Sequence, residues 1–295
     1  MNGLLVQFLG LFALLGIVAW GYWRWIRPRQ VGIQGKGMLL LTIVTLVGGL
    51  LGSTGWWIDD PRSFSWDLPP LASRMLASAG WAFGVATIAA LQRPVPRRMR
   101  LVMLMLAVYL APLLVAVPLF HLDRFDPAAP ITYGFFALVL SMTVAALWYM
   151  FQQPIIIPDE PADSLPPTSL VGVWLGLVAA VTALWGLALF ITDNGPSHLI
   201  WAWPWDLLTS RLIAVMLLTI AVGAVYALRY ADVSRVMLGV IAIYGFGVTL
   251  ANLWNILVSK PVNPSYVAAF GIMFLVSATL LIAERQSTVE RSGTP

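Results

Sequence analysis

Long apolar stretches recur along the chain, separated by short polar segments. About 20 helical residues are needed to cross the ~30 Å hydrocarbon core of a bilayer, so each stretch predicts a membrane-spanning helix. Nine spans are expected, at residues 3–26, 37–58, 70–91, 101–120, 131–151, 169–192, 207–229, 236–257 and 264–283. The pattern therefore predicts an all-α fold, a polytopic transmembrane helical bundle.

The composition supports a surface that faces lipid. Of the 295 residues, 60% are hydrophobic and only 10% are charged, and the mean hydropathy is +0.85. A soluble domain carries roughly 25% charged residues, because its surface faces water. The net charge of +4 comes from basic residues in the loops, which is typical of a membrane protein and not of a nucleic-acid-binding protein.

The distribution of basic residues predicts the orientation. The first span ends in aromatic and basic residues and lacks a signal-peptide cleavage site, so it is expected to stay as an anchor. With the N-terminus outside, twelve of the 17 Lys and Arg residues lie on the inner side and five on the outer side. The positive-inside rule then predicts that the N-terminus lies outside and the C-terminus inside, and the plasma membrane is the expected location.

Two blocks of four spans flank a proline-rich acidic stretch and suggest an internal repeat. Residues 64–91 align without gaps to residues 201–228, with identities that include Trp66 with Trp203, Ser73 with Ser210 and Arg74 with Arg211. An even number of spans makes such repeats parallel. The expected organisation is an anchor and basic loop (1–36), a first four-helix repeat (37–151), a linker (152–167), a second repeat (168–284) and a polar tail (285–295).

One sequence motif resembles a known family. The stretch 201–211 reads W-A-W-P-W-D-L-L-T-S-R, and 64–74 looks like a second copy. It resembles the pattern W-P-W-x-L-T-P-L-T-A-R of a family of uncharacterised bacterial multi-span membrane proteins, and the sequence from Leu119 to Asp126 is similar to an H-x-D-R-F motif of the same family. Asp206 and Leu207 depart from the pattern. The resemblance implies the architecture and carries no activity.

An arginine lies at a matched place in each repeat, just inside a span and after a tryptophan-rich loop. An arginine is costly inside the membrane, so each one is expected to reach the interface, or to pair with an outer carboxylate or a loop carbonyl. The candidate structural or binding residues on this outer side are Arg74, Arg211, Trp66, Trp203, Asp67 and Asp206.

Other residues offer weaker candidates for chemistry. The chain has no cysteine and two histidines, and no nucleotide-binding, hydrolase or metalloprotease motif, so no cofactor, catalytic residue or metal site is predicted. Both histidines fall at span ends, where they are expected to bond backbone or water. Asn252 and Asn255 lie one turn apart, and they either join helices or line a polar path. The weaker candidates are His121, Asp123, His198, Asn252 and Asn255.

The sequence leaves three functions open. The favoured one is a structural or accessory subunit of a membrane assembly, with the lipid bilayer and membrane protein subunits as partners. A carrier or channel for an uncharged or lipid-like molecule would need a polar cavity. An outer-face enzyme acting on lipid headgroups would need carboxylates and histidines gathered in a cleft.

Overall fold

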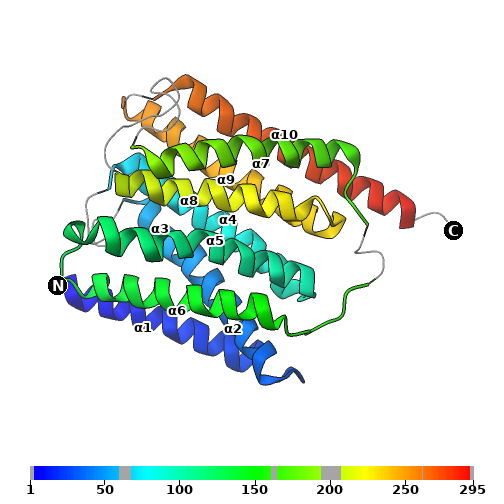
Figure 1. The fold of residues 1–295 in the computed structure, drawn as a ribbon, viewed down its shortest axis with the longest axis horizontal. Helices are drawn as coiled ribbons and strands as arrows, with labels where there is room; N and C mark the ends of the chain where they lie inside the picture. Colours follow the sequence, from blue (N-terminus) through cyan, green and yellow to red (C-terminus); the bar gives the residue numbers. More distant parts are fainter. Residues whose placement is uncertain (1–2, 60–67, 161–164, 194–206, 261, 293–295) are drawn as a thin grey trace. The chain divides into compact units, whose positions relative to one another are not determined.

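The chain is a multi-pass membrane protein built from α-helices. A computed structural model describes residues 3–59, 68–160, 165–193, 207–260 and 262–292, and all regular structure in these ranges is helical (Figure 1). Eight of the helices described are long and apolar enough to cross a membrane. The first expected span is also helical, over the 19 residues of α1 (Gly3–Gly21). The predicted all-α polytopic fold is thus confirmed.

The chain divides into two compact units, Met1–Asp159 and Glu160–Pro295. The boundary falls inside the proline-rich stretch at 152–167. In the first unit, α4 packs against the segment formed by α2, η2 and α3, while α5 packs against α6 and against α4. Its elements are α1, η1 (Tyr22–Ile26), α2 (Ile33–Val47), η2 (Gly48–Gly52), α3 (Ser53–Trp57), α4 (Pro70–Gln92), α5 (Pro96–Phe120), η4 (Leu122–Arg124) and α6 (Pro130–Gln152).

Four long helices are described in the second unit, and each packs against the next one along the chain. Helix α7 packs against α8, α8 against α9, and α9 against α10 (Figure 1). The helices are α7 (Ser169–Ile191), α8 (Leu207–Ala227), α9 (Ala231–Leu257) and α10 (Pro264–Ser292). Proline occupies the first position of α4, α5, α6 and α10, where its missing N–H costs no helical hydrogen bond.

Several helices extend beyond the apolar stretches that predicted them. Helix α5 begins at Pro96 instead of residue 101, α9 begins at Ala231 instead of 236, and α10 continues to Ser292 through the expected polar tail. The added turns hold charged residues, which form helix readily but do not raise hydropathy. The expected second span is interrupted by a π-helical turn at η2. Helix α5 continues through Pro112 and Pro118.

Close approach between helices depends on glycine in both units. In the first unit a Cβ at Gly80 would overlap the Ser53 hydroxyl and lie 2.6 Å from the Gly49 carbonyl oxygen. In the second unit a Cβ at Gly245 would lie 2.8 Å from both the Phe270 carbonyl oxygen and the Phe274 nitrogen. Since these neighbours are largely backbone, a larger residue would push the helices apart.

Candidate functional site

In each unit, a serine at the matched position binds a backbone carbonyl at the predicted outer end. In the first unit the Ser73 hydroxyl donates to the Trp56 carbonyl at 2.6 Å, and in the second the Ser210 hydroxyl donates to the Asp193 carbonyl at 2.7 Å. Each acceptor lies 17 residues before its serine, at or just beyond the end of the preceding helix. A helix end leaves carbonyls without helical donors, so each serine completes the end of its neighbour.

The arginine next to each serine also binds a backbone carbonyl. The Arg211 Nε–H donates to the Phe190 carbonyl at 3.1 Å, and its guanidinium lies 5.5 Å from the centre of the Phe190 ring. Arg211 thereby joins the start of α8 to the end of α7. Arg74 is placed alike, and its Nη1 donates to the Pro70 carbonyl, one turn earlier in α4, at 3.5 Å. Both side chains are half-buried.

Part of the tryptophan-rich outer side is described. Trp56 and Trp57 are half-buried at the end of α3, and the Trp57 ring lies 4.7 Å from that of Trp81 on α4. The remaining outer-side candidates lie outside the described residues: Trp66, Asp67, His198, Trp203 and Asp206. The expected pairing of an outer carboxylate such as Asp67 or Asp206 with the arginines stays a prediction.

The candidates for headgroup chemistry in the first unit lie near the end of α5. His121 follows this helix directly and is buried, whereas Asp123 lies in η4 and is exposed. Within the ranges that the structure describes, no group of three or more histidine and acidic side chains is placed to hold a metal ion.

Asn252 and Asn255 are buried on one face of α9. The Asn252 amide nitrogen donates to the Val248 carbonyl of its own helix at 2.7 Å, and not to a neighbouring helix as interhelical bonding would require. The side-chain oxygens of both residues have no hydrogen-bond partner. These two acceptors are the clearest unsatisfied polar groups among the described residues.

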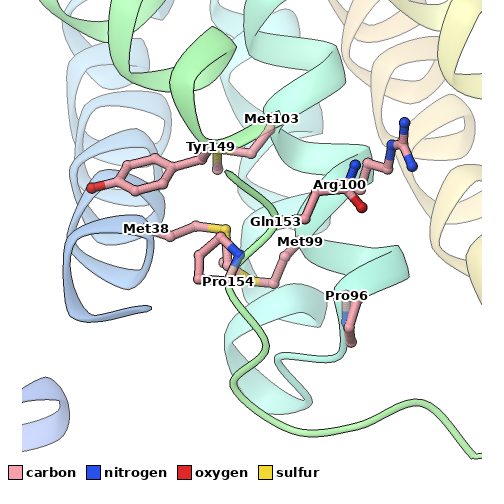
Figure 2. A pocket seen from close by; sticks show the side chains of 8 residues that line it. All are labelled: Met38, Pro96, Met99, Arg100, Met103, Tyr149, Gln153 and Pro154. Atoms are coloured by element: carbon pink, nitrogen blue, oxygen red, sulfur yellow. The ribbon is translucent and has the colours of Figure 1, made fainter. Parts of the chain in front are cut away.

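A shallow cleft opens in the first unit, at the predicted inner ends of α2, α5 and α6 (Figure 2). Its empty space of about 230 Å³ includes open solvent, and the room that it leaves for water-sized molecules is only about 10 Å³. Its walls are apolar apart from Tyr149, Gln153 and the exposed Arg100. The lining residues are Met38, Pro96, Met99, Arg100, Met103, Tyr149, Gln153 and Pro154. Such a cleft is smaller than the sites that enclose drug-sized ligands.

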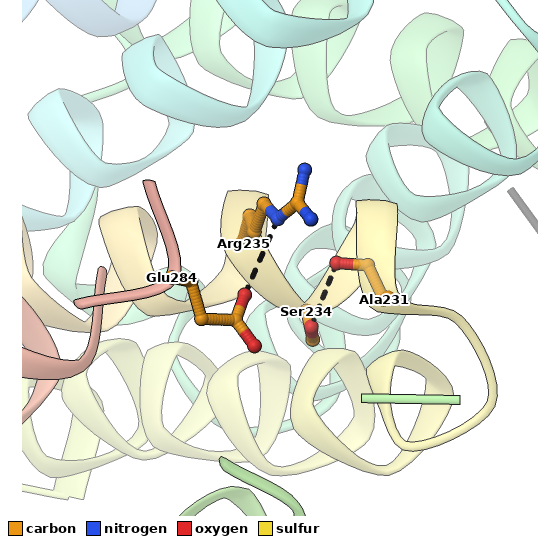
Figure 3. A network of polar contacts seen from close by, with 4 residues as sticks. All are labelled: Ala231, Ser234, Arg235 and Glu284. Carbon is orange, nitrogen blue, oxygen red and sulfur yellow. Dashed lines mark hydrogen bonds and ion pairs between the residues drawn. The ribbon is translucent and has the colours of Figure 1, made fainter. Parts of the chain in front are cut away.

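Polar links near the predicted inner ends were not expected from the sequence. In the second unit the Arg235 Nε–H bonds Glu284 Oε2 at 3.3 Å and joins α9 to α10, beside the hydrogen bond from the Ser234 hydroxyl to the Ala231 carbonyl (Figure 3). In the first unit Arg98 donates to the Ala89 carbonyl at 2.9 Å, near the end of α4. Arg98 and Arg235 are 137 residues apart, as are Arg74 and Arg211. This shared spacing is the sequence signal that could have indicated Arg98 and Arg235 as a matched pair.

Comparison with known proteins gives no relative: no family model, curated protein or solved structure matches the chain.

Proposed function

We propose that the chain is a structural or accessory subunit of a membrane assembly. The observation that carries the proposal is how buried hydroxyl groups in the spans are used. Thr42, Thr45, Thr87, Thr182 and Thr219 each donate to a carbonyl of their own helix, at 2.6–2.9 Å. Side chains bonded in this way present little polarity to a solute, and they leave the helices free to pack closely.

The exposed face of α7 is the surface that best suits a partner helix. Its exposed positions are aliphatic and recur every three to four residues: Leu170, Val173, Leu177, Val181, Leu184, Leu187 and Ile191. Gly172 and Gly176 lie along the same helix, and nothing lies within 4 Å of a Cβ built at either glycine. Small residues one turn apart let a second transmembrane helix approach closely.

Affinity purification from native membranes tests this role. We expect a membrane protein partner to copurify with the wild-type chain in mild detergent and to be lost on Gly176→Leu, because the larger side chain fills the groove. The matched control is Gly134→Leu on α6, where a Cβ likewise meets nothing within 4 Å. If a partner still copurifies with both variants, it contacts a surface other than this face of α7. The absence of any copurifying partner from native membranes would refute the proposal.

We also propose that the two units descend from a duplicated four-helix block. Helices α4 and α8 begin 137 residues apart, at Pro70 and Leu207, and α5 and α9 end 137 residues apart, at Phe120 and Leu257. The same spacing relates the two serine bonds, donors and acceptors alike. It also relates the Thr45 bond to the Leu41 carbonyl and the Thr182 bond to the Val178 carbonyl.

A carrier for a small uncharged molecule is the second candidate. The specific observation in its favour is the pair of buried amide oxygens on α9, which have no hydrogen-bond partner. A test that separates the candidates is transport of small uncharged solutes into proteoliposomes that hold the chain alone. Uptake that depends on Asn252 would favour the carrier, because a structural subunit has no reason to move solute.

A further inference from the structure

Two asparagines on α9 bury acceptor groups that no group among the described residues satisfies. Asn252 is 0% exposed and Asn255 is 5% exposed, and Oδ1 of each has no hydrogen-bond partner. Buried polar side chains in proteins nearly always find a partner, which is either a protein group or a bound water or ion. Two unpartnered oxygens one helical turn apart therefore indicate a site and not a packing accident.

The bond made by the Asn252 amide nitrogen fixes the direction of its oxygen. Nδ2 donates to the Val248 carbonyl at 2.7 Å. Only the nitrogen can face that carbonyl, because an oxygen there would place two acceptors together. Oδ1 is consequently turned away from the Val248 carbonyl. Residues three apart on a helix have Cβ atoms ~5–6 Å apart, so one small donor can reach both side chains.

The packing of α9 on α10 locates the pair. Gly245 abuts the α10 backbone between Phe270 and Phe274. Asn252 lies about two turns further along α9, and antiparallel packing places it level with the first turn of α10. There Tyr266 is fully buried, with its ring 5.5 Å from Trp185 and 4.7 Å from Phe270. The level of the pair is thus filled by large aromatic side chains.

In the first unit, the corresponding face lies on α5 and is apolar and largely exposed. The residues 137 positions before Thr249, Asn252 and Asn255 are Pro112, Val115 and Pro118. Val115 is 58% exposed and Pro118 is also exposed. The same helix face is therefore apolar and open in one unit, and polar and covered in the other. Asparagines that only filled a lipid-facing position would not be covered.

These observations limit the chemistry of the ligand. Two amide oxygens accept hydrogen bonds, so the ligand must donate. Divalent cations usually take carboxylates among about six or more oxygen ligands, and within the described residues no group of three or more acidic and histidine side chains is placed to hold a metal ion. A water molecule has two O–H donors, so one molecule can bond both oxygens, and buried waters in proteins typically bond polar groups that are otherwise unsatisfied. We infer that Asn252 and Asn255 together hold a buried water molecule within the second unit.

Selective labelling offers a direct test, because the chain has few asparagines: Asn2, Asn194, Asn252, Asn255 and Asn263. The full chain is prepared in lipid nanodiscs with ¹⁵N-labelled asparagine, and magnetisation transfer from water to the side-chain amides is measured by NMR. The Asn252 and Asn255 signals are assigned from Asn252→Leu and Asn255→Leu, which keep the branched shape and the number of side-chain heavy atoms. We expect transfer to both amides although both are buried, because the water lies beside them.

The single variants distinguish one water molecule shared by both asparagines from bulk solvent that reaches each asparagine independently. On Asn255→Leu, transfer to Asn252 should fall about twofold or more, because the water loses one of its two acceptors. Thr249→Val is the matched control and should leave the transfer unchanged, since the Thr249 hydroxyl bonds the Gly245 carbonyl of its own helix at 2.7 Å. No transfer to either wild-type amide would overturn the inference, as would transfer to Asn252 that is unaffected by Asn255→Leu.

Discussion

At the scale of single residues, Gly80 sets the distance between α4 and the segment that ends in α3. We expect Gly80→Ala to lower the free energy of unfolding by about 1–3 kcal/mol, because the new methyl group meets Ser53 and the Gly49 backbone. Unfolding in mixed detergent and SDS micelles measures the change. Gly134→Ala on α6 has open space and should be neutral or slightly stabilising. Equal destabilisation by both variants would contradict the packing described here.

Arg211 makes a second prediction at this scale. It links two helices through the Phe190 carbonyl and lies near the Phe190 ring. We expect Arg211→Ala and Arg211→Lys both to destabilise the protein, by roughly 1–2 kcal/mol, because a lysine cannot offer the same planar set of donors.

The exposed Arg229 gives the control for this prediction, and Arg229→Lys should leave the melting temperature unchanged. If Arg211→Lys melts like the wild type, the arginine only reaches toward the interface, and its hydrogen bond contributes nothing measurable.

The sequence indicated some of these residues and not others. The register of Arg74 with Arg211 was visible because an arginine inside an apolar stretch is rare. The bonding of Asn252 was not, because an asparagine in a span can bond its own helix or a neighbour, and only the geometry decides between them. Arg235 was counted as a loop charge, whereas it lies within α9 and pairs with Glu284.

At the scale of elements, the matched serines each secure a helix end. We expect Ser73→Ala and Ser210→Ala each to cost about 1 kcal/mol, because each leaves a carbonyl near a helix end without its donor. The double variant should show the sum, since the sites belong to different units. Ser141→Ala on the exposed side of α6 should change stability little. A large effect from only one of the two serines would argue against equivalent roles.

Helix number was well predicted from the sequence, and helix ends were not. Hydropathy reports where a helix crosses lipid, because only apolar residues tolerate that environment. It does not report where helical hydrogen bonding stops, so the first turns of α5 and α9, with Arg97, Arg98 and Arg235, fell outside the expected spans. The π-helical turns at Tyr22–Ile26 and Gly48–Gly52 carry no hydropathy signal either.

At the scale of the whole molecule, an ion pair links Asp159, the last residue before the boundary between the units, to Arg97 of the first unit. Arg97 Nε lies 3.2 Å from Asp159 Oδ2. With 16% and 24% of their side-chain surfaces exposed, the two groups are largely buried, and the cost of removing both charges from water offsets much of their attraction. The pair therefore orders the start of the linker without fixing the fold, and the stability of each unit is expected to come from its own helix packing.

The last prediction concerns the orientation of the chain. In the part of the chain that the structure describes, the eight apolar helices and the preceding α1 make nine, an odd number, which would place the termini on opposite sides of the membrane. The basic residues near the starts of α2, α5 and α9 favour the inner side for these ends. A reporter fused after Pro295 should therefore be cytoplasmic, and one inserted after Ala128, between η4 and α6, should be periplasmic or extracellular. Both reporters on the same side would mean that a span is missing, and an exchange of the two would mean that the orientation is reversed.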